Sequence, residues 1–253
     1  MKRSLAATAD LTDYEDFHAV SSLQGWQVDR LRLADPSSWP REWTEVARRD
    51  SGRLPLTPLP RPRPLTMGLG DALIRRRTDR GARSEPVAVQ DLADLLGWSL
   101  GTREQPGAAP GSRRHYPSAG ARFPIDCHIL ALNTEGIAHG AHLYSPFEHG
   151  CLTYGSVIHD ADVERLLGFG DTALPRMILI LSASMNRTTR KYGERGYRYA
   201  LIEAGHMMQN LYLTAAALDL PFAAVGGFCD IDARRLIDGL ETDELPLYCA
   251  VLP

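Results

Sequence analysis

The stretch RKYGERGYRYALIEAGHMMQN, residues 190–210, decides the fold that we expect. From about residue 197 to residue 218, apolar and small residues recur at helical spacing, which predicts the longest helix of the chain. One narrow polar stripe runs along this helix: Glu203, His206, Asn210 and Thr214. A helix that is apolar on its other sides is buried nearly all round. We therefore expect it to be either the spine of a domain or half of an oligomer interface.

Shorter elements are predicted on both sides of this helix. Helical patterns cover residues 69–77, 89–100, 160–167 and 232–240, and β-rich runs cover residues 127–133, 176–184, 221–225 and 245–253, with a hairpin over 142–155. The segment that carries Lys191 is expected to be a connection into the long helix. Helices and strands mixed with a hairpin are typical of an α+β fold, with helices packed around one sheet.

Residues 54–65, LPLTPLPRPRPL, contain five prolines, so they cannot form the interior of a helix or a central strand. We interpret them as an extended connector. It divides an N-terminal arm with its connector, residues 1–65, from a main domain, residues 66–253. The arm carries three tryptophans, Trp26, Trp39 and Trp43. Their apolar partners are too few to build a separate core, so the arm is expected to lie on the domain or on a partner.

The composition limits the classes of function. The 253 residues carry a formal net charge of -3, with a pI near 6.2, which gives no general electrostatic reason to bind nucleic acid. No apolar run is long enough for a membrane span, or for a secretory signal at the N-terminus. We therefore predict a cytoplasmic protein that binds neither nucleic acid nor a membrane.

Cysteine, histidine and carboxylate residues do not suggest a metal site. Cys127, Cys151, Cys229 and Cys249 are far apart and show no CxxC spacing, so we interpret them as small buried apolar residues. Glu203 and His206 have the Glu-x-x-His spacing of di-iron bundles, but that fold requires a second such pair and two further carboxylate helices. A buried polar stripe is the favoured interpretation. His139, His142 and His149 flank the predicted hairpin turn and are expected to be solvated loop residues.

An arginine-rich stretch could hold a phosphate. IRRRTDR, residues 74–80, places three arginines and a hydroxyl at the end of a helix, where guanidinium groups can chelate a phosphate monoester. A solvated basic helix end would explain it equally well. GLG at 68–70 and GFG at 168–170 complete no dinucleotide fingerprint, so a Rossmann domain is not expected.

Two glycine-containing loops could approach a flat ligand. SRRHYPSAGARFP, residues 112–124, adds Arg113 and Arg114 to a turn of small residues, which let the backbone come close to a ligand. AVGGFCD, residues 224–230, places Gly226 and Gly227 at a strand end, where a bare backbone N–H could face a ring nitrogen. A tight turn would explain either stretch.

Lys191 differs from the other basic residues. The chain has only two lysines, Lys2 and Lys191, among 28 basic residues. Arginine stays protonated in proteins and cannot act as a base, whereas lysine can. Lys191 is therefore a candidate base, although an arginine-rich chain can also keep a surface lysine by chance.

Taken in order, the stretches IRRRTDR, SRRHYPSAGARFPID, RKYGERGYRYALIEAGHMMQN and AVGGF resemble the nitroreductase-like flavoproteins, and specifically the SagB-type (McbC-like) azoline dehydrogenases. Members of that family finish thiazole and oxazole rings in ribosomally made peptides, beside a cyclodehydratase that makes the azolines. The resemblance covers residues 66–253. It implies a nitroreductase-like α+β fold, with a central mixed sheet flanked by helices, in a domain-intertwined homodimer that binds two FMN molecules at the subunit interface.

The resemblance also implies roles for single residues. The matching FMN contacts are Arg76, Arg77 and Thr78 at the phosphate and ribityl chain, Pro117, Ser118 and Gly120 beside the ring, Gly226 and Gly227 facing flavin N5, and Arg113 or Arg114 as the remaining cation at the phosphate. Lys191 and Tyr192 match the family's catalytic pair. Either could be the base: Tyr192 if the positive charge of Lys191 and Arg190 acidifies its phenol, or Lys191 if neighbouring arginines lower its pKa.

The chain departs from the family pattern at three places. Gly81 and Ala82 follow Arg80 where related proteins often have an aromatic residue. Ala121 replaces an asparagine that touches the ring in ordinary nitroreductases, as it does throughout the SagB-like subgroup. Because the sequence ends at Pro253, a C-terminal arm around the partner subunit is expected to be short or absent. Two alternatives stay open: a flavin oxidase of another small-molecule or carrier-bound substrate, and a catalytically silent scaffold of a peptide-modifying complex.

Overall fold

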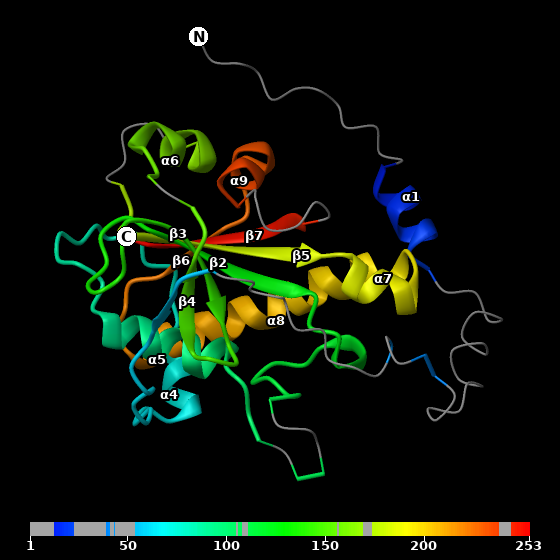
Figure 1. Ribbon diagram of the computed structural model, residues 1–253, viewed down its shortest axis with the longest axis horizontal. Helices are drawn as coiled ribbons and strands as arrows, with labels where there is room; N and C mark the ends of the chain where they lie inside the picture. Colours follow the sequence, from blue (N-terminus) through cyan, green and yellow to red (C-terminus); the bar gives the residue numbers. More distant parts are fainter. Residues whose placement is uncertain are drawn as a thin grey trace.

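The computed structural model describes residues 13–22, 39–40, 43, 54–104, 106–107, 111–155, 157–168, 174–237 and 244–253. A seven-stranded sheet in the order β1-β4-β3-β2-β5-β7-β6 forms the centre of this part of the chain. Helices α4, α5 and α8 cover one face of the sheet, and α6 and α9 cover the other (Figure 1). The predicted α+β class, with helices packed around one sheet, is confirmed.

The strands are β1 (Leu56–Pro58), β2 (Ile125–Ala131), β3 (Gly140–Ser145), β4 (Gly150–Thr153), β5 (Met177–Ser184), β6 (Ala223–Val225) and β7 (Glu244–Leu252). The expectation of a mixed sheet is wrong, because all six neighbouring pairs of these strands are antiparallel. Strands β5 and β6 run in the same direction, but β7 lies between them and pairs antiparallel with both. The helical connection from β5 to β6 therefore creates no parallel neighbours.

The helices are α1 (Asp13–Val20), α4 (Leu69–Arg75), α5 (Val89–Leu100), α6 (Asp160–Leu167), α7 (Asn186–Tyr192), α8 (Arg195–Ala217) and α9 (Asp230–Ile237). The predictions for α5 and α6 are confirmed residue for residue. Helix α4 ends two residues before the predicted end, so the arginines that follow it lie in a loop. Residues 186–192 were expected to belong to a connection, but they form helix α7. Residues 238–240, the predicted end of α9, lie outside the described residues.

Strand β5 is the centre of the core. All eight of its residues are buried, which agrees with its continuous apolar sequence MILILSAS. Its two faces belong to different clusters of buried residues, one beneath α5 and α8 and the other beneath α6 and α9. Helix α8 packs against α4, α5 and α7 and so positions three segments that surround the predicted site.

The proline-rich connector contributes an edge strand that the sequence did not indicate. Strand β1 pairs with β4, and the backbone N–H of Thr153 donates to the carbonyl of Pro55 at 2.9 Å. An edge position is compatible with proline, because one side of the strand needs no hydrogen-bond donors. The proposed boundary at residue 65 stays a prediction.

Helix α8 is less enclosed than expected. Glu203 and Thr214 are buried, but His206 is exposed. Leu201 and Ile202 are 37% and 50% exposed, so one face of α8 is open to solvent in the single chain. The prediction of a helix buried nearly all round is therefore wrong for one copy of the chain.

The hairpin histidines are not all solvated. His142 is fully buried in β3, where its ring nitrogens bond to the hydroxyl of Thr153 and the carbonyl of Ala138. His149 is half-buried and bonds to the hydroxyl of Tyr144, and only His139 is exposed as expected. The cysteine prediction is confirmed for three thiols, which are buried and free: Cys127, Cys151 and Cys249.

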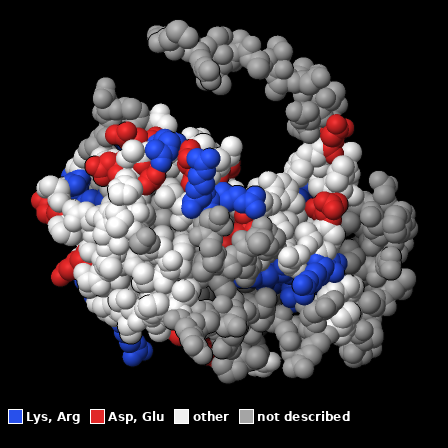
Figure 2. All heavy atoms as spheres, turned by 45° about the horizontal axis from the view of Figure 1, so that its top comes forward, with Lys and Arg blue, Asp and Glu red and all other residues white. Residues whose placement is uncertain are grey.

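The charge of the surface and the apolar character of the helices are relevant to possible partners. On the face shown in Figure 2, basic and acidic side chains are interspersed, and wide areas carry neither. Among the described helices, none is both long enough and apolar enough to cross a membrane. The absence of a nucleic-acid partner stays a prediction based on the charge balance.

A buried polar network ties three strands together. Nε2 of His128 in β2 lies 2.6 Å from a carboxylate oxygen of Glu244 in β7, and Nδ1 bonds to the hydroxyl of Tyr154 at 2.8 Å. The hydroxyl of Ser182 in β5 donates to the same Glu244 oxygen at 2.5 Å. His128 and Ser182 are fully buried, so these groups stabilise the sheet and are closed to a substrate.

We expect His128→Ala to lower the free energy of unfolding by roughly 3 to 5 kcal/mol, because it removes the imidazole that pairs with a buried carboxylate. Urea unfolding of the variant and of the parent protein at pH 7 measures the difference. His139→Ala, at an exposed histidine, is the control and should change the stability little. A loss below about 1 kcal/mol for His128→Ala would contradict this role of the network.

Candidate functional site

The loop after α4 is fastened to strand β6 by one tyrosine. The hydroxyl of Tyr212 on α8 accepts the backbone N–H of Ala224 at 2.8 Å and shares a hydrogen bond with the hydroxyl of Thr78 at 3.1 Å. The guanidinium of Arg76 lies 5.4 Å from the centre of the same ring. We call Arg76, Thr78, Tyr212 and Ala224 the Tyr212 cluster. It brings two of the predicted cofactor stretches together.

The three predicted phosphate residues differ in their surroundings. Arg77 is exposed and pairs with Asp79 at 3.0 Å, so its positive charge is already balanced by a carboxylate. Together with a backbone hydrogen bond from Gly81, this pair lowers the pKa of Asp79. Arg76 is half-buried, and no carboxylate of the described residues pairs with it. Arg76 and Thr78 are therefore better placed than Arg77 to bind an anion.

Gly226 and Gly227 follow β6 directly after the Tyr212 cluster. Both are exposed, and a Cβ atom built on either would meet no atom within 4 Å. Packing within the single chain therefore does not require glycine at these positions. A flat group lying on this backbone would require it, because a side chain would occupy its place.

The second predicted loop lies against the lysine and tyrosine of α7. Gly120 has φ of 60°, and a Cβ atom there would lie 2.3 Å from the Tyr192 hydroxyl and 3.2 Å from Nζ of Lys191. Any side chain at this position would displace these groups. We call Ser118, Gly120, Lys191, Tyr192 and Glu203 the lysine cluster, since Glu203 of α8 joins the same loop. The loop of Ser118 and Gly120 thus meets the stretch at 190–210, which lies about seventy residues further along the chain.

The pKa values of Lys191 and Tyr192, the predicted catalytic pair, are shifted in opposite directions. Burial, and secondarily the positive charge of Arg122, lowers the pKa of Lys191. Burial, and secondarily the neighbouring phenol of Tyr199, raises the pKa of Tyr192. The ring of Tyr199 packs edge-on against that of Tyr192, with 5.1 Å between their centres. These surroundings favour a neutral amine and disfavour a phenolate.

Glu203 supports the loop from below. Its side chain is 2% exposed and hydrogen-bonds Ser118, whose hydroxyl also accepts the backbone N–H of Phe123 at 2.9 Å. Burial raises the pKa of Glu203 to about 8. The polar stripe on α8 indicated that Glu203 is buried, but its contact with this loop could not be predicted from the sequence. His206 points elsewhere, since it is exposed.

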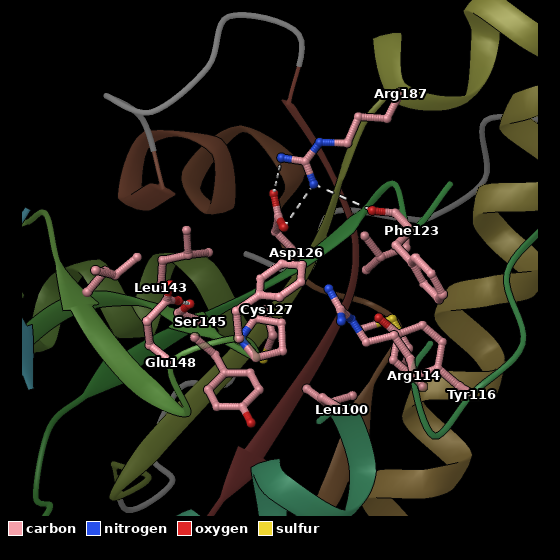
Figure 3. Close-up of a pocket in the computed structure, with 16 residues that line it drawn as sticks. Leu100, Arg114, Tyr116, Phe123, Asp126, Cys127, Leu143, Ser145, Glu148 and Arg187 are labelled. Atoms are coloured by element: carbon pink, nitrogen blue, oxygen red, sulfur yellow. Dashed lines mark hydrogen bonds and ion pairs between the residues drawn. The ribbon is translucent and has the colours of Figure 1, made fainter. Parts of the chain in front are cut away.

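Arg113 and Arg114 lie apart from the Tyr212 cluster. Arg113 donates to the carbonyl of Ser112 within its own loop. Arg114 is buried between the rings of Phe123 and Phe147, at 5.0 and 4.4 Å from their centres. Figure 3 shows it reaching into a cavity of about 80 Å³, whose lining includes no residue of the Tyr212 cluster. A phosphate role for either arginine stays a prediction.

The two clusters lie at opposite ends of α8. Helix α7, with Lys191, meets the start of α8, whereas α4 packs beside its C-terminal part (Figure 1). Tyr212 follows Glu203 by nine residues, which places them about 14 Å apart along the helix axis. Within one chain the two clusters are therefore separate groups of residues.

A comparison with protein families covers both clusters. The model of the nitroreductase family matches residues 73–252, which include every residue of the two clusters. The chain belongs to the nitroreductase family. Members of this family are flavin-dependent oxidoreductases that generally bind FMN.

Two curated relatives are similar in sequence. A Methanocaldococcus jannaschii protein named as a nitroreductase is 33% identical over 184 residues, which cover 71% of this chain and 87% of that protein. The microcin B17-processing protein McbC of Escherichia coli is 34% identical over 129 residues, which cover 48% of this chain and 47% of McbC. The chain therefore matches about half the length of McbC.

Two solved structures share the fold. A nitroreductase structure from Ralstonia eutropha has a TM-score of 0.65 at 21% identity and covers 82% of this chain and 92% of that chain. A chain of the E. coli microcin synthetase McbBCD complex, solved with truncated pro-MccB17 bound, has a TM-score of 0.60 at 21% identity. That match covers 95% of this chain and 91% of the other, and it confirms the nitroreductase-like fold.

We expect Glu203→Gln to remove a pH dependence of stability. The carboxyl has a pKa of about 8 in the folded chain and about 4.3 in the unfolded chain. Between these values only the folded state holds the proton, so the wild-type free energy of unfolding falls as the pH rises. Urea unfolding at pH 5, 7 and 9 should show the variant gaining stability relative to wild type across this range. Glu164→Gln, at an exposed glutamate of α6, is the control, and a parallel pH profile for Glu203→Gln would refute the assignment.

Proposed function

We propose that this chain is an FMN-dependent dehydrogenase that oxidises thiazoline or oxazoline rings of a ribosomally made peptide to thiazoles or oxazoles. The observation that carries the proposal is the contact of Lys191 and Tyr192 with Gly120, inside a nitroreductase-family domain. The similarity to McbC, a protein named for processing microcin B17, supports a peptide as the substrate.

The reaction requires a base beside the ring. Aromatising an azoline removes a proton from the ring carbon next to the carbonyl and a hydride from the neighbouring ring carbon, so the product is lighter by two hydrogens. Bound FMN supplies the hydride acceptor. The proton must go to a group of the protein that is within hydrogen-bond reach and unprotonated before the transfer.

Lys191 meets this requirement better than Tyr192. Its lowered pKa increases the fraction of neutral amine near pH 7, whereas the raised pKa of Tyr192 keeps the phenol protonated. In our proposal the Lys191 amine takes the proton from carbon. Tyr192, held by the ring of Tyr199, donates a hydrogen bond to the carbonyl next to that carbon. This is the assignment that we propose between the two roles that the sequence left open.

The residues present fit FMN. Arg76 and Thr78 offer a cation and a hydroxyl to a phosphate, and no carboxylate of the described residues neutralises Arg76. Gly226 and Gly227 leave open backbone for a ring. Pro117 and Ser118 belong to the same loop as Gly120, and Glu203 supports that loop.

We propose that two copies of the chain complete each site. One chain separates the Tyr212 cluster from the lysine cluster along α8. The face of α8 that carries Leu201 and Ile202 is open to solvent and apolar. If a second copy covers this face with its own α8, the ends of the two helices can bring unlike half-sites together. This arrangement is the homodimer that the family resemblance implies.

The proposed partners are a precursor peptide and a cyclodehydratase, in the cytoplasm. The structural likeness to a chain of the McbBCD complex, solved with pro-MccB17 bound, supports this assembly as a hypothesis. A different substrate, or a silent scaffold, would give a different result in the experiments below. An azoline peptide that loses no mass with the flavin-loaded protein would favour another substrate, and a protein purified without flavin would favour the scaffold.

We expect Lys191→Ala and Tyr192→Phe to slow azoline oxidation by roughly a hundredfold or more, the usual effect of losing a general acid or base. Mass spectrometry measures the loss of 2 Da per ring. Lys191→Arg is the informative variant, because arginine keeps the charge but cannot act as the base. We expect it to be as slow as the alanine variant, whereas Arg190→Ala, at an exposed neighbour, should be active. Rates near wild type for Lys191→Arg would show that only the charge is needed.

Arg76→Ala should weaken flavin binding about tenfold or more, since it removes a charge-assisted hydrogen bond to the phosphate. Titration of the flavin-free protein with FMN, followed by absorbance, measures the dissociation constant. Arg80→Ala removes an exposed arginine from the same loop and should bind FMN like the wild type. Equal affinity of the Arg76 variant and the wild type would contradict the phosphate site.

A further inference from the structure

The N-terminal arm is anchored beside the lysine cluster. Helix α1 lies at the start of α8, where the guanidinium of Arg195 donates to the carbonyl of Ser21 at 2.8 Å and that of Arg198 donates to the carbonyl of His18 at 3.0 Å. The ring of Phe17 packs edge-on against Tyr197, with 5.6 Å between the centres. Arg195 follows Lys191 by only four residues. The arm, which lies outside the family match, therefore meets the domain next to the proposed base.

A tryptophan of this arm lies on the proposed base itself. Nζ of Lys191 is 3.9 Å from the centre of the Trp39 ring, a cation–π distance. The same Nζ is 3.2 Å from the position that a Cβ atom of Gly120 would take. Both Lys191 and Trp39 are half-buried. The amine thus contacts an indole ring of the arm and lies close to the Gly120 backbone.

The position of this ring conflicts with proton transfer. A ring carbon that gives its proton to Lys191 must come within roughly 3.5 Å of Nζ. Two flat rings cannot both lie within contact distance on the same side of one amine. A substrate ring that approaches Nζ from the side of Trp39 must therefore take the place of the indole. An indole is also a flat aromatic heterocycle, similar in shape to the azole product.

We propose that Trp39 is a gate on the substrate site, which covers the Lys191 amine in the free protein and is displaced by the flat heterocycle of the substrate. The inference rests on the proposed role of Lys191 as the base. It assigns a function to the N-terminal arm, which neither the family match nor the sequence explains. It also provides selectivity, because a substrate without a ring able to replace the indole leaves the amine covered.

The two lysines of the chain allow a direct test that does not depend on turnover. The full-length, flavin-loaded protein is treated with a limiting amount of acetic acid N-hydroxysuccinimide ester, and peptide mass spectrometry gives the acetylation rates of Lys191 and Lys2. Lys2 is the internal reference. We expect Trp39→Ala to raise the rate at Lys191 relative to Lys2 by about fivefold or more. Trp39→Phe, which keeps a ring, should stay near the wild-type ratio.

A matched control is available in Trp98. This tryptophan is 38% exposed, stacks on His115 and makes no contact with Lys191, so Trp98→Ala should leave the ratio unchanged. The measurement is repeated at several pH values. Greater access of the reagent to Lys191 raises its acetylation rate by the same factor at every pH, whereas a changed pKa shifts the midpoint of the pH–rate curve. An unchanged ratio in Trp39→Ala, or a shifted midpoint alone, would overturn the gate.

Turnover then tests what the gate does. Displacing Trp39 costs the substrate one cation–π contact, so Trp39→Ala should raise kcat/KM for a short azoline peptide by about two- to fivefold. A fall in kcat/KM would overturn the proposal, because it would show that Trp39 assists the substrate. If the labelling ratio rises but no variant oxidises an azoline peptide, Trp39 still covers Lys191, and it is the proposed reaction that is wrong.

Discussion

The close approach of Gly120 to the side chains of α7 is the contact on which the proposed site depends. With φ of 60°, Gly120 allows this approach without strain, whereas a Cβ atom here would displace the Tyr192 hydroxyl. The approach places the backbone of one motif against the amine and phenol of another. Glu203, buried beneath the loop, fixes it through Ser118. A flat surface and two polar groups are thereby held together by the fold.

Helix α8 positions both clusters of the proposed site. It carries Glu203 beneath the loop of Ser118 and Gly120, and Tyr212 beside the loop that follows α4. Its packing against α4, α5 and α7 fixes the distance between the two clusters. The two clusters lie apart along this one helix, and the exposed Leu201 and Ile202 of α8 are where we propose that a second copy packs. In that proposal, both the fold and the assembled site depend on the same helix.

The sequence predicted elements whose patterns are local. Helix α5 and strand β5 were predicted closely because one has apolar residues at helical spacing before Gly101 and the other is a continuous apolar run. Helix α7 was missed because its sequence NRTTRKY is polar and has only one buried residue, Thr188. The prediction of a mixed sheet was wrong because the order and direction of neighbouring strands depend on contacts across the whole chain.

The site could be predicted only as separate motifs. The resemblance named Gly120, Lys191 and Tyr192, but their contact joins positions about seventy residues apart and depends on tertiary packing. The roles of Tyr212 and Glu203 were not visible, because a tyrosine and a glutamate on a buried helix carry no motif of their own. Nothing in the sequence of the arm indicated that Trp39 lies on Lys191. Long-range contacts of this kind follow from the fold and not from local spacing.

The most direct measurement is a crystal structure of the purified protein with its flavin bound. We expect a homodimer in which each FMN has its phosphate at Arg76 and Thr78 of one chain, with its ring between Gly226–Gly227 of that chain and the Gly120 loop of the other. Lys191 and Tyr192 should face the open side of that ring. A monomer, or a dimer whose flavin lies away from these two side chains, would contradict the proposed site.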